Sequence, residues 1–307
     1  MMKNSEKTAD FIEELQRSEN IIDLLRNRGL HLTKFAGKLT GDAETVGILL
    51  VGSVAEGYAT DASDIDFLIL SYSNRDEVDF STSLSIESGN SLETLTYLDG
   101  VEINTEVVLW DDHVTIAESL AKLSADVALN RHISKMPMID NYTLRFLHRL
   151  RTGIVVYGED VIEQFRTDFH IDSLPLYISI KKFVLARESL EDAKSADPEV
   201  FGLIEFICRD VIEHCCLSLA AANGFTSQSR RFVLNWIADL TEAEQEFPLF
   251  VRLRERLIGI VPLPPAEKSA LVDEIEGLVQ ATMSVLQMDH TRRRLLDQIF
   301  ADISYAQ

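Results

Sequence analysis

The sequence has little cysteine and no long apolar run. It contains three cysteines in 307 residues, and Cys208, Cys215 and Cys216 lie close together in a helical pattern without the spacing of metal ligands. We therefore expect buried structural thiols. No stretch approaches the length of a membrane-spanning helix, and the polar N-terminus lacks the apolar core of a secretory signal. These absences predict a cytoplasmic protein.

Basic residues are scarce as well. The chain has 29 lysines and arginines against 50 aspartates and glutamates, which gives a net charge of −21 at pH 7. A protein that holds nucleic acid through its phosphates needs basic clusters, and an acidic field repels a polyanion. We therefore expect no nucleic-acid partner and favour a small molecule, since the same field attracts a polycation. The 46% of hydrophobic and 26% of charged residues are typical of a soluble globular protein.

One stretch carries most of the chemical information: residues 48–70, with the sequence ILLVGSVAEGYATDASDIDFLIL. It predicts a buried strand, a Gly-Ser turn, a short connection and a second buried strand that opens with two aspartates. Asp64 and Asp66 are separated by one residue, and alternate side chains of a strand point to the same face. We therefore expect the two carboxylates to lie side by side.

Two anionic groups held that close repel each other unless a cation lies between them. Hard oxygen ligands suit Mg²⁺, which keeps several waters and shares its remaining positions with substrate phosphates. Gly52 and Ser53 predict the other half of the site, because a phosphate can approach a backbone without Cβ and a hydroxyl can donate to its oxygens. Each motif alone has a plainer interpretation as a solvated turn. The apolar strands on both sides favour the interpretation as a metal and phosphate site.

These residues resemble a known family. The polymerase-β-like nucleotidyltransferase superfamily has a Gly-Ser turn followed by an Asp-x-Asp strand, and here the matching residues are Gly52-Ser53, Gly57 and 63–66. The resemblance implies an enzyme that transfers a nucleoside monophosphate from a nucleoside triphosphate. It also implies Mg²⁺ on the aspartates and a third carboxylate nearby.

A hairpin is expected after this stretch. Residues 92–98 and 101–110 are strand-like and flank Asp99-Gly100, a dipeptide that strongly favours a tight hairpin turn. The polar residues 71–90 before it are expected to be irregular, with at most one short helix. We expect the second arm of the hairpin to lie antiparallel beside the Asp-x-Asp strand.

This second arm supplies the candidates for the third carboxylate. Glu102, Asn104 and Glu106 share one face of the strand, so periodicity does not choose between the two glutamates. The family resemblance favours Glu106, because the third acidic residue of the superfamily lies within an apolar run. Glu102 would then be a solvated residue just after the turn.

The remainder of the chain has a helical pattern. An amphipathic helix is expected over residues 8–28, and further helices are expected near 111–127, 142–152, 174–193, 198–223, 230–238, 241–258, 266–286 and 290–303. Residues 154–157, bracketed by glycines, fit either a strand or an extended link. We predict an α/β nucleotidyltransferase domain, a mixed sheet with flanking helices, over residues 1–150. An all-α helical bundle is predicted over residues 151–307.

Part of the helical half resembles a narrower group. Residues 215–240 are similar to the C-terminal region of aminoglycoside adenylyltransferases of the streptomycin and spectinomycin type. In that group a helix leads to a Gly and then to a basic residue six positions before a Trp, here Gly224, Arg230 and Trp236. The resemblance implies that Arg230 binds the triphosphate. An arginine usual in the preceding helix is missing and Arg209 lies two turns earlier instead, which leaves the acceptor open.

The resemblance implies Mg²⁺-dependent transfer of AMP from ATP to a hydroxyl of a small molecule, such as an aminoglycoside antibiotic, with release of pyrophosphate. Asp64 and Asp66 would hold the metal, Glu106 would complete the metal set or act as general base, and Gly52 and Ser53 would position the phosphates. One alternative is a nucleotidyltransferase that modifies a macromolecule, as a tRNA-targeting toxin or a protein-modifying enzyme does. Another is a non-catalytic nucleotide-binding module.

Overall fold

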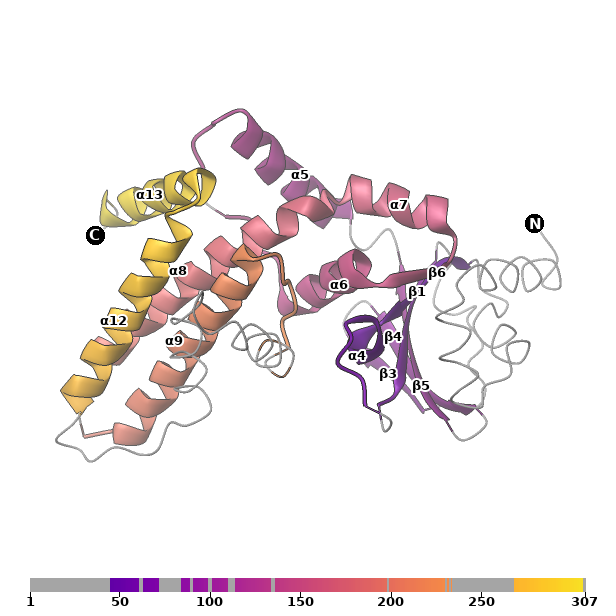
Figure 1. The fold of residues 1–307 in the computed structure, drawn as a ribbon, viewed down its shortest axis with the longest axis horizontal. Helices are drawn as coiled ribbons and strands as arrows, with labels where there is room; N and C mark the ends of the chain where they lie inside the picture. Colours follow the sequence, from indigo (N-terminus) through magenta and orange to yellow (C-terminus); the bar gives the residue numbers. More distant parts are fainter. Residues whose placement is uncertain are drawn as a thin grey trace. The chain divides into compact units, whose positions relative to one another are not determined.

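The structure is a computed structural model. It describes residues 45–60, 63–71, 84–88, 91–98, 101–109, 114–133, 136–197, 199–229, 231, 233 and 268–305. The described residues belong to two compact units, one formed by the chain up to Ala121 together with Ile139–Ile171, the other by Lys122–Met138 and the chain from Asp172. The predicted fold class, an α/β region followed by a mostly helical one, is confirmed (Figure 1). The predicted domain boundary at residue 150 stays a prediction.

The first unit is built on a six-stranded sheet with the order β3-β4-β5-β2-β1-β6. The strands are β1 (Thr45–Val51), β2 (Ile65–Ser71), β3 (Leu84–Ser88), β4 (Ser91–Leu98), β5 (Val101–Leu109) and β6 (Ile154–Tyr157). The apolar runs ILLV of β1 and FLIL of β2 are buried along their whole length. A strand covered on both faces needs such a continuous run, which explains why neither run alternates with polar residues.

The course of the chain after β2 differs from the prediction. β4 and β5 do form the predicted antiparallel hairpin, although its Asp99-Gly100 turn lies outside the described residues. β5, however, runs parallel to β2, with Asp66 opposite Asn104. The cause is β3, a strand in a region predicted to be irregular. β3 lies at the edge of the sheet, and two antiparallel steps, to β4 and then to β5, bring the chain back beside β2 in its own direction.

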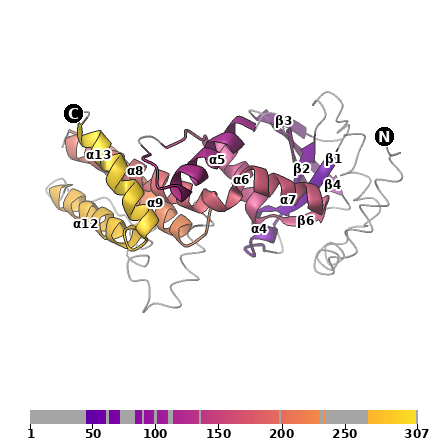
Figure 2. The ribbon, with the colours of Figure 1, turned by 90° about the horizontal axis from the view of Figure 1, so that it is seen from above.

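The flanking helices of this unit are α6 (Asn141–Thr152) and α7 (Glu159–Asp168), and both contact β1 (Figure 2). Between them β6 resolves the alternative left open for residues 154–157, because it pairs antiparallel with β1. Gly158 follows β6 with φ of +74°, and a Cβ there would collide with the Val46 carbonyl oxygen. A glycine is therefore needed where α7 begins.

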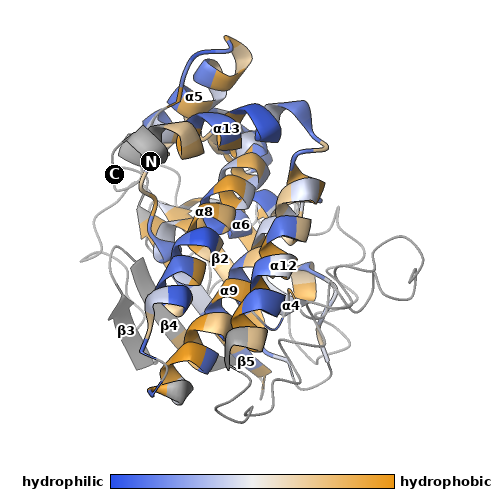
Figure 3. Cartoon of the chain, turned by 90° about the vertical axis from the view of Figure 1, so that its left-hand side faces the viewer, coloured by the Kyte–Doolittle hydropathy of each residue, from blue (hydrophilic) through white to orange (hydrophobic). Residues whose placement is uncertain are grey.

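The second unit is helical. Its long helices are α8 (Leu174–Ser195), α9 (Phe201–Ala222), α12 (Lys268–Leu286) and α13 (His290–Tyr305), and α5 (Val114–Ala128) and a 3₁₀ turn (Ile171–Ser173) lie at its borders. Apolar and polar residues alternate along α8, α9 and α12, which pack against one another (Figure 3). The three cysteines lie on α9 as free, buried thiols, which confirms the prediction made for them.

Several predicted helices cannot be compared. The helices expected over residues 8–28, 230–238 and 241–258 lie outside the described residues, as does Arg230. α7 (Glu159–Asp168) was not predicted. The other predicted helices that the structure describes begin and end within about three residues of their predicted bounds, close to the usual scatter at helix ends. No helix among the described residues combines the length and apolarity that a membrane crossing requires.

Candidate functional site

The two aspartates lie where β2 begins. Asp64 immediately precedes the strand, and Asp66 is its second residue, opposite Val51 of β1. Burial and the negative charge of Asp64 raise the pKa of Asp66 to about 6. The positive charge of Arg149 and a hydrogen bond from Asn104 act in the opposite direction but are outweighed. The structure thus brings together two carboxylates whose mutual repulsion is only partly relieved by the protein.

The Gly-Ser turn lies directly against them. It forms the short helix α4 (Gly52–Ala55), in which Gly52 has φ of +70°. A Cβ at Gly52 would overlap the carboxylate of Asp66, so this position needs glycine both for its backbone and for the space. Ser53 is buried. The amides of Glu56 and Tyr58 donate to the carbonyls of Gly52 at 3.0 Å and of Ser53 at 2.8 Å, which closes the turn.

Asn104 is the residue of β5 that meets the aspartates. It lies opposite Asp66 in the parallel register, and its Nδ2 donates to Oδ2 of Asp64 at 2.5 Å. The sequence analysis placed Asn104 on the same face as the two glutamates but gave it no role. The parallel pairing of β5 with β2 puts Asn104, and not a glutamate, opposite Asp66. The apolar pattern of the two strands predicts neither their relative direction nor their register.

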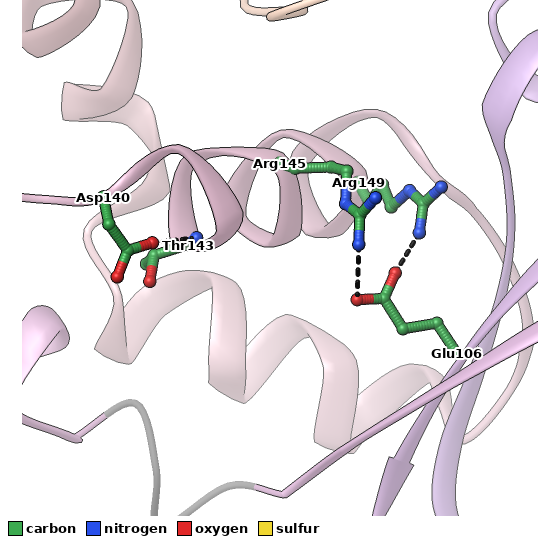
Figure 4. Close-up of polar contacts among 5 residues, drawn as sticks. All are labelled: Glu106, Asp140, Thr143, Arg145 and Arg149. Atoms are coloured by element: carbon green, nitrogen blue, oxygen red, sulfur yellow. Dashed lines mark hydrogen bonds and ion pairs between the residues drawn. The ribbon is translucent and has the colours of Figure 1, made fainter. Parts of the chain in front are cut away.

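Glu106, predicted as the third carboxylate, lies one strand step further along, opposite Leu68. Its side chain is buried, with 3% exposed. One carboxylate oxygen accepts from Arg149 and the other from Arg145 at 3.4 Å (Figure 4). The part of the chain that the structure describes contains no group of three or more acidic, histidine or cysteine side chains arranged to hold a metal. The negative charge of Glu106 also helps to raise the pKa of Asp66, and its metal or base role stays a prediction.

The residue at which α6 begins and the helical period together place both arginines on the side of α6 that contacts Glu106. Asp140 caps the helix by accepting from the Thr143 amide at 2.7 Å (Figure 4). Arg145 and Arg149 are four residues apart, which places them on one face of the helix. The cap fixes where the helix begins, and the period then brings both guanidinium groups to Glu106.

The same helix also reaches the Gly-Ser turn. Nε2 of His148 lies 3.2 Å from Oε1 of Glu56, the residue that follows α4, and both side chains are almost fully buried. Consecutive residues of α6, His148 and Arg149, therefore hold two different elements of the site. These contacts involve Arg145, His148 and Arg149 of α6 and Glu56 beside the turn. None of the four was predicted, because the contacts join segments that lie far apart in the sequence.

Two predicted residues remain without a placement at the site. Arg230 lies outside the described residues. Glu102, the alternative to Glu106, lies in β5 opposite Tyr97 of β4 and is half-buried. No described contact joins either residue to the aspartates.

The aspartate pair fits a divalent metal. Its donor atoms are hard carboxylate oxygens, the ligands that Mg²⁺ prefers, and burial and the charge of Asp64 raise the pKa of Asp66, which a bound cation would lower again. An amide side chain at Asn104 adds a neutral oxygen of the same chemical kind. Asp64 and Asp66 are therefore the residues that would hold such an ion.

One of three comparisons with known proteins bears on this site. Residues 32–139 match the family model described as "Nucleotidyltransferase domain". A search among curated proteins finds no significant match. Among solved structures the chain is similar to a nucleotidyltransferase-like protein from Exiguobacterium sibiricum 255-15, at 12% identity over 85% of this chain and 84% of that one, with a TM-score of 0.39.

The match covers the turn, both aspartates and β5, which are parts of the site found above. Residues 32–139 of the chain are similar to a nucleotidyltransferase domain.

Proposed function

We propose that this protein transfers AMP from ATP to a hydroxyl group of a small cationic molecule, with Mg²⁺ and with release of pyrophosphate. The observation that carries the proposal is the pair Asp64 and Asp66 with Gly52 packed against it, inside a segment that is similar to a nucleotidyltransferase domain. A carboxylate pair beside a glycine, which has no Cβ, is suited to bind a metal-bound triphosphate.

The reaction makes a bond between the acceptor oxygen and the α-phosphorus and breaks the bond from that phosphorus to the leaving pyrophosphate. Mg²⁺, held by Asp64 and Asp66, would supply neutralisation of the charge that develops on the phosphates. Gly52 would let a phosphate approach the chain, and the Ser53 hydroxyl would donate to it. Arg230 would add a positive charge by analogy with the adenylyltransferases that the chain resembles.

Glu106 takes a different role in this proposal from the one expected from the sequence. A general base needs a free oxygen within reach of the proton it accepts. Both oxygens of Glu106 accept hydrogen bonds from arginines. We therefore assign Glu106 to holding Arg149, whose positive charge lowers the pKa of Asp66, and not to proton transfer.

The acceptor is proposed from charge. With a net charge of −21, the protein attracts cations and repels polyanions, so a polycation such as an aminoglycoside is favoured over tRNA. A role in antibiotic resistance follows if such a drug is the physiological acceptor.

The test is pyrophosphate release from each of the four ribonucleoside triphosphates with Mg²⁺, in the presence of a panel that includes streptomycin and spectinomycin. Release that depends on one panel member and on ATP, and that is lost in Asp64→Asn, supports the proposal. Release with a protein or tRNA in place of the panel would move the acceptor to that class. A chain that releases no pyrophosphate with any acceptor contradicts the transferase proposal.

One observation favours a second function, nucleotide binding without transfer. The residue of β5 that contacts the aspartates is the neutral Asn104, and the nearest buried acid, Glu106, is paired with arginines. A site with fewer acidic ligands can still bind a metal nucleotide. Mg²⁺-dependent ATP binding without pyrophosphate release would identify this function.

A further inference from the structure

On the face of the sheet that carries the aspartates, the residue of β5 opposite Asp66 is an amide, although its neighbours along this face are acidic. Glu102, Asn104 and Glu106 alternate along β5 on this face. The parallel register puts the middle residue, the amide, opposite Asp66. Asn104 contacts Asp64 with an N–H donor, and a donor stabilises a carboxylate without adding negative charge.

The charge of Glu106 is not available to a metal. Its two oxygens accept from Arg149 and Arg145, and its own side chain is buried, although Arg145 is partly exposed. Removing one partner of such a pair leaves an uncompensated buried charge, so the pair resists rearrangement. Arg149 also extends its positive charge to Asp66.

The two features act in the same direction. A second divalent cation beside the first needs additional carboxylate ligands to offset the repulsion between the ions. This site offers an amide opposite Asp66, where such a carboxylate would lie, and the positive charge of Arg149, which acts on Asp66, opposes a further cation. One divalent ion is balanced by Asp64, Asp66 and the phosphates of a nucleotide.

We propose that the nucleotide site of this protein holds a single divalent cation, with Asn104 as the residue that limits the number of ions to one. The inference rests on the proposed nucleotide binding and specifies its metal content. Asn104 acts in two ways: its amide N–H satisfies Asp64 without metal, and a half-turn of the amide presents its oxygen instead of its nitrogen. Arg149, held by Glu106, takes the place of a second cation as a fixed positive charge.

The test counts Mn²⁺ ions by electron paramagnetic resonance, using the full chain with an equimolar α,β-methylene analogue of ATP, which cannot release pyrophosphate. The nucleotide analogue alone is the reference. We expect one bound Mn²⁺ per chain in the wild type, held at least about tenfold more tightly than by the analogue alone. In Asn104→Asp we expect a second bound Mn²⁺ per chain.

Glu163→Gln is the control, because it removes an exposed acidic side chain of α7 that pairs with Arg166 of the same helix. It should leave the count at one and the affinity unchanged. A second Mn²⁺ in the wild type, or a count that stays at one in a folded Asn104→Asp variant, would overturn the inference. The wild-type count decides even if Asn104→Asp fails to fold.

The outcomes separate this inference from the proposed function. Two Mn²⁺ ions in a wild-type protein that releases pyrophosphate contradict only the single-ion site. Mn²⁺ binding no tighter than by the analogue alone, together with an absence of pyrophosphate release, contradicts both.

Discussion

Two places on one face of the sheet treat carboxylates in opposite ways. At the start of β2, Asp64 and Asp66 lie close together, a hydrogen bond from Asn104 and the positive charge of Arg149 relieve them only in part, and the pKa of Asp66 rises to about 6. One strand step away, Glu106 is buried but bonded by two arginines. We interpret the aspartates as carboxylates that can bind a ligand and Glu106 as a carboxylate that stabilises the fold.

This difference bears on the simplest argument from the sequence, in which the role of Glu106 as third carboxylate stays a prediction. Three acidic residues on two neighbouring strands suggest a three-carboxylate metal site, yet burial with a full set of donors indicates a structural role. The uncompensated pair is the better functional candidate, because perturbed carboxyl pKa values concentrate at functional sites.

The largest effect on stability is expected at the compensated carboxylate. Glu106→Gln leaves Arg149 and Arg145 beside a neutral amide, and breaking a buried ion pair costs about 3 kcal/mol. We expect the Tm to fall by about 5 °C or more, measured by calorimetry or circular dichroism. The control Glu163→Gln removes the exposed partner of Arg166 and should change Tm by less than about 1 °C. Equal Tm values for the two variants would contradict the structural role of Glu106.

The next effect is expected at the turn against the uncompensated pair. Gly52→Ala combines a left-handed backbone with a collision against the Asp66 carboxylate, and we expect a loss of about 2 kcal/mol together with loss of nucleotide binding. Gly57→Ala is the matched control: Gly57 also has a positive φ, of +79°, but its Cβ would meet no atom within 4 Å. That variant should lose about 1 kcal/mol and keep nucleotide binding. Chemical denaturation and a nucleotide titration of both variants measure the difference.

At the aspartates themselves the predicted change in stability has the opposite sign. The pKa of Asp66 is raised from 3.8 to about 6, so the folded metal-free protein binds more protons than the unfolded chain between those values, and its stability falls as pH rises through that window. Asp66→Asn removes this penalty. Above pH 6 the variant should be more stable than wild type in EDTA by on the order of 2 kcal/mol, and below pH 4 the advantage should vanish. A variant advantage that does not depend on pH would contradict the strained-carboxylate account.

A smaller effect is expected where α6 supports the Gly-Ser turn. His148→Ala leaves buried Glu56 without its closest partner, and we expect a loss of about 1–2 kcal/mol and a several-fold weaker affinity for Mg²⁺-ATP. His170→Asn serves as control, because His170 is exposed and asparagine tolerates its left-handed conformation. Unchanged nucleotide affinity in a destabilised His148→Ala would limit the contact to a purely structural role.

The sequence alone predicted those parts of the fold that depend on local pattern. The apolar runs of β1 and β2, the hairpin of β4 and β5 and the helices after residue 140 other than α7 follow from periodicity and turn residues. β3 was missed because its residues LSIES are short and mostly polar. Without β3 the direction of β5 could not be derived, and an antiparallel strand was expected.

The residues of the candidate site also fall into those that local sequence predicts and those that it does not. Asp64, Asp66, Gly52 and Ser53 lie within fifteen consecutive residues, and their arrangement follows from one strand, one turn and one strand. Asn104 and Arg149 come from distant segments that only the sheet register and the capped start of α6 bring to the aspartates. No spacing in the sequence encodes those contacts.

Calorimetric titration of ATP into the wild type and Asp64→Asn, each with Mg²⁺ and with EDTA, tests most directly whether the aspartate pair is a metal-nucleotide site. We predict that the wild type binds ATP at least about tenfold more tightly with Mg²⁺ than with EDTA, and that Asp64→Asn loses this difference while remaining folded. ATP binding that is the same with and without Mg²⁺, or that is unchanged in Asp64→Asn, would contradict the assignment of Asp64 and Asp66 as the functional centre of this protein.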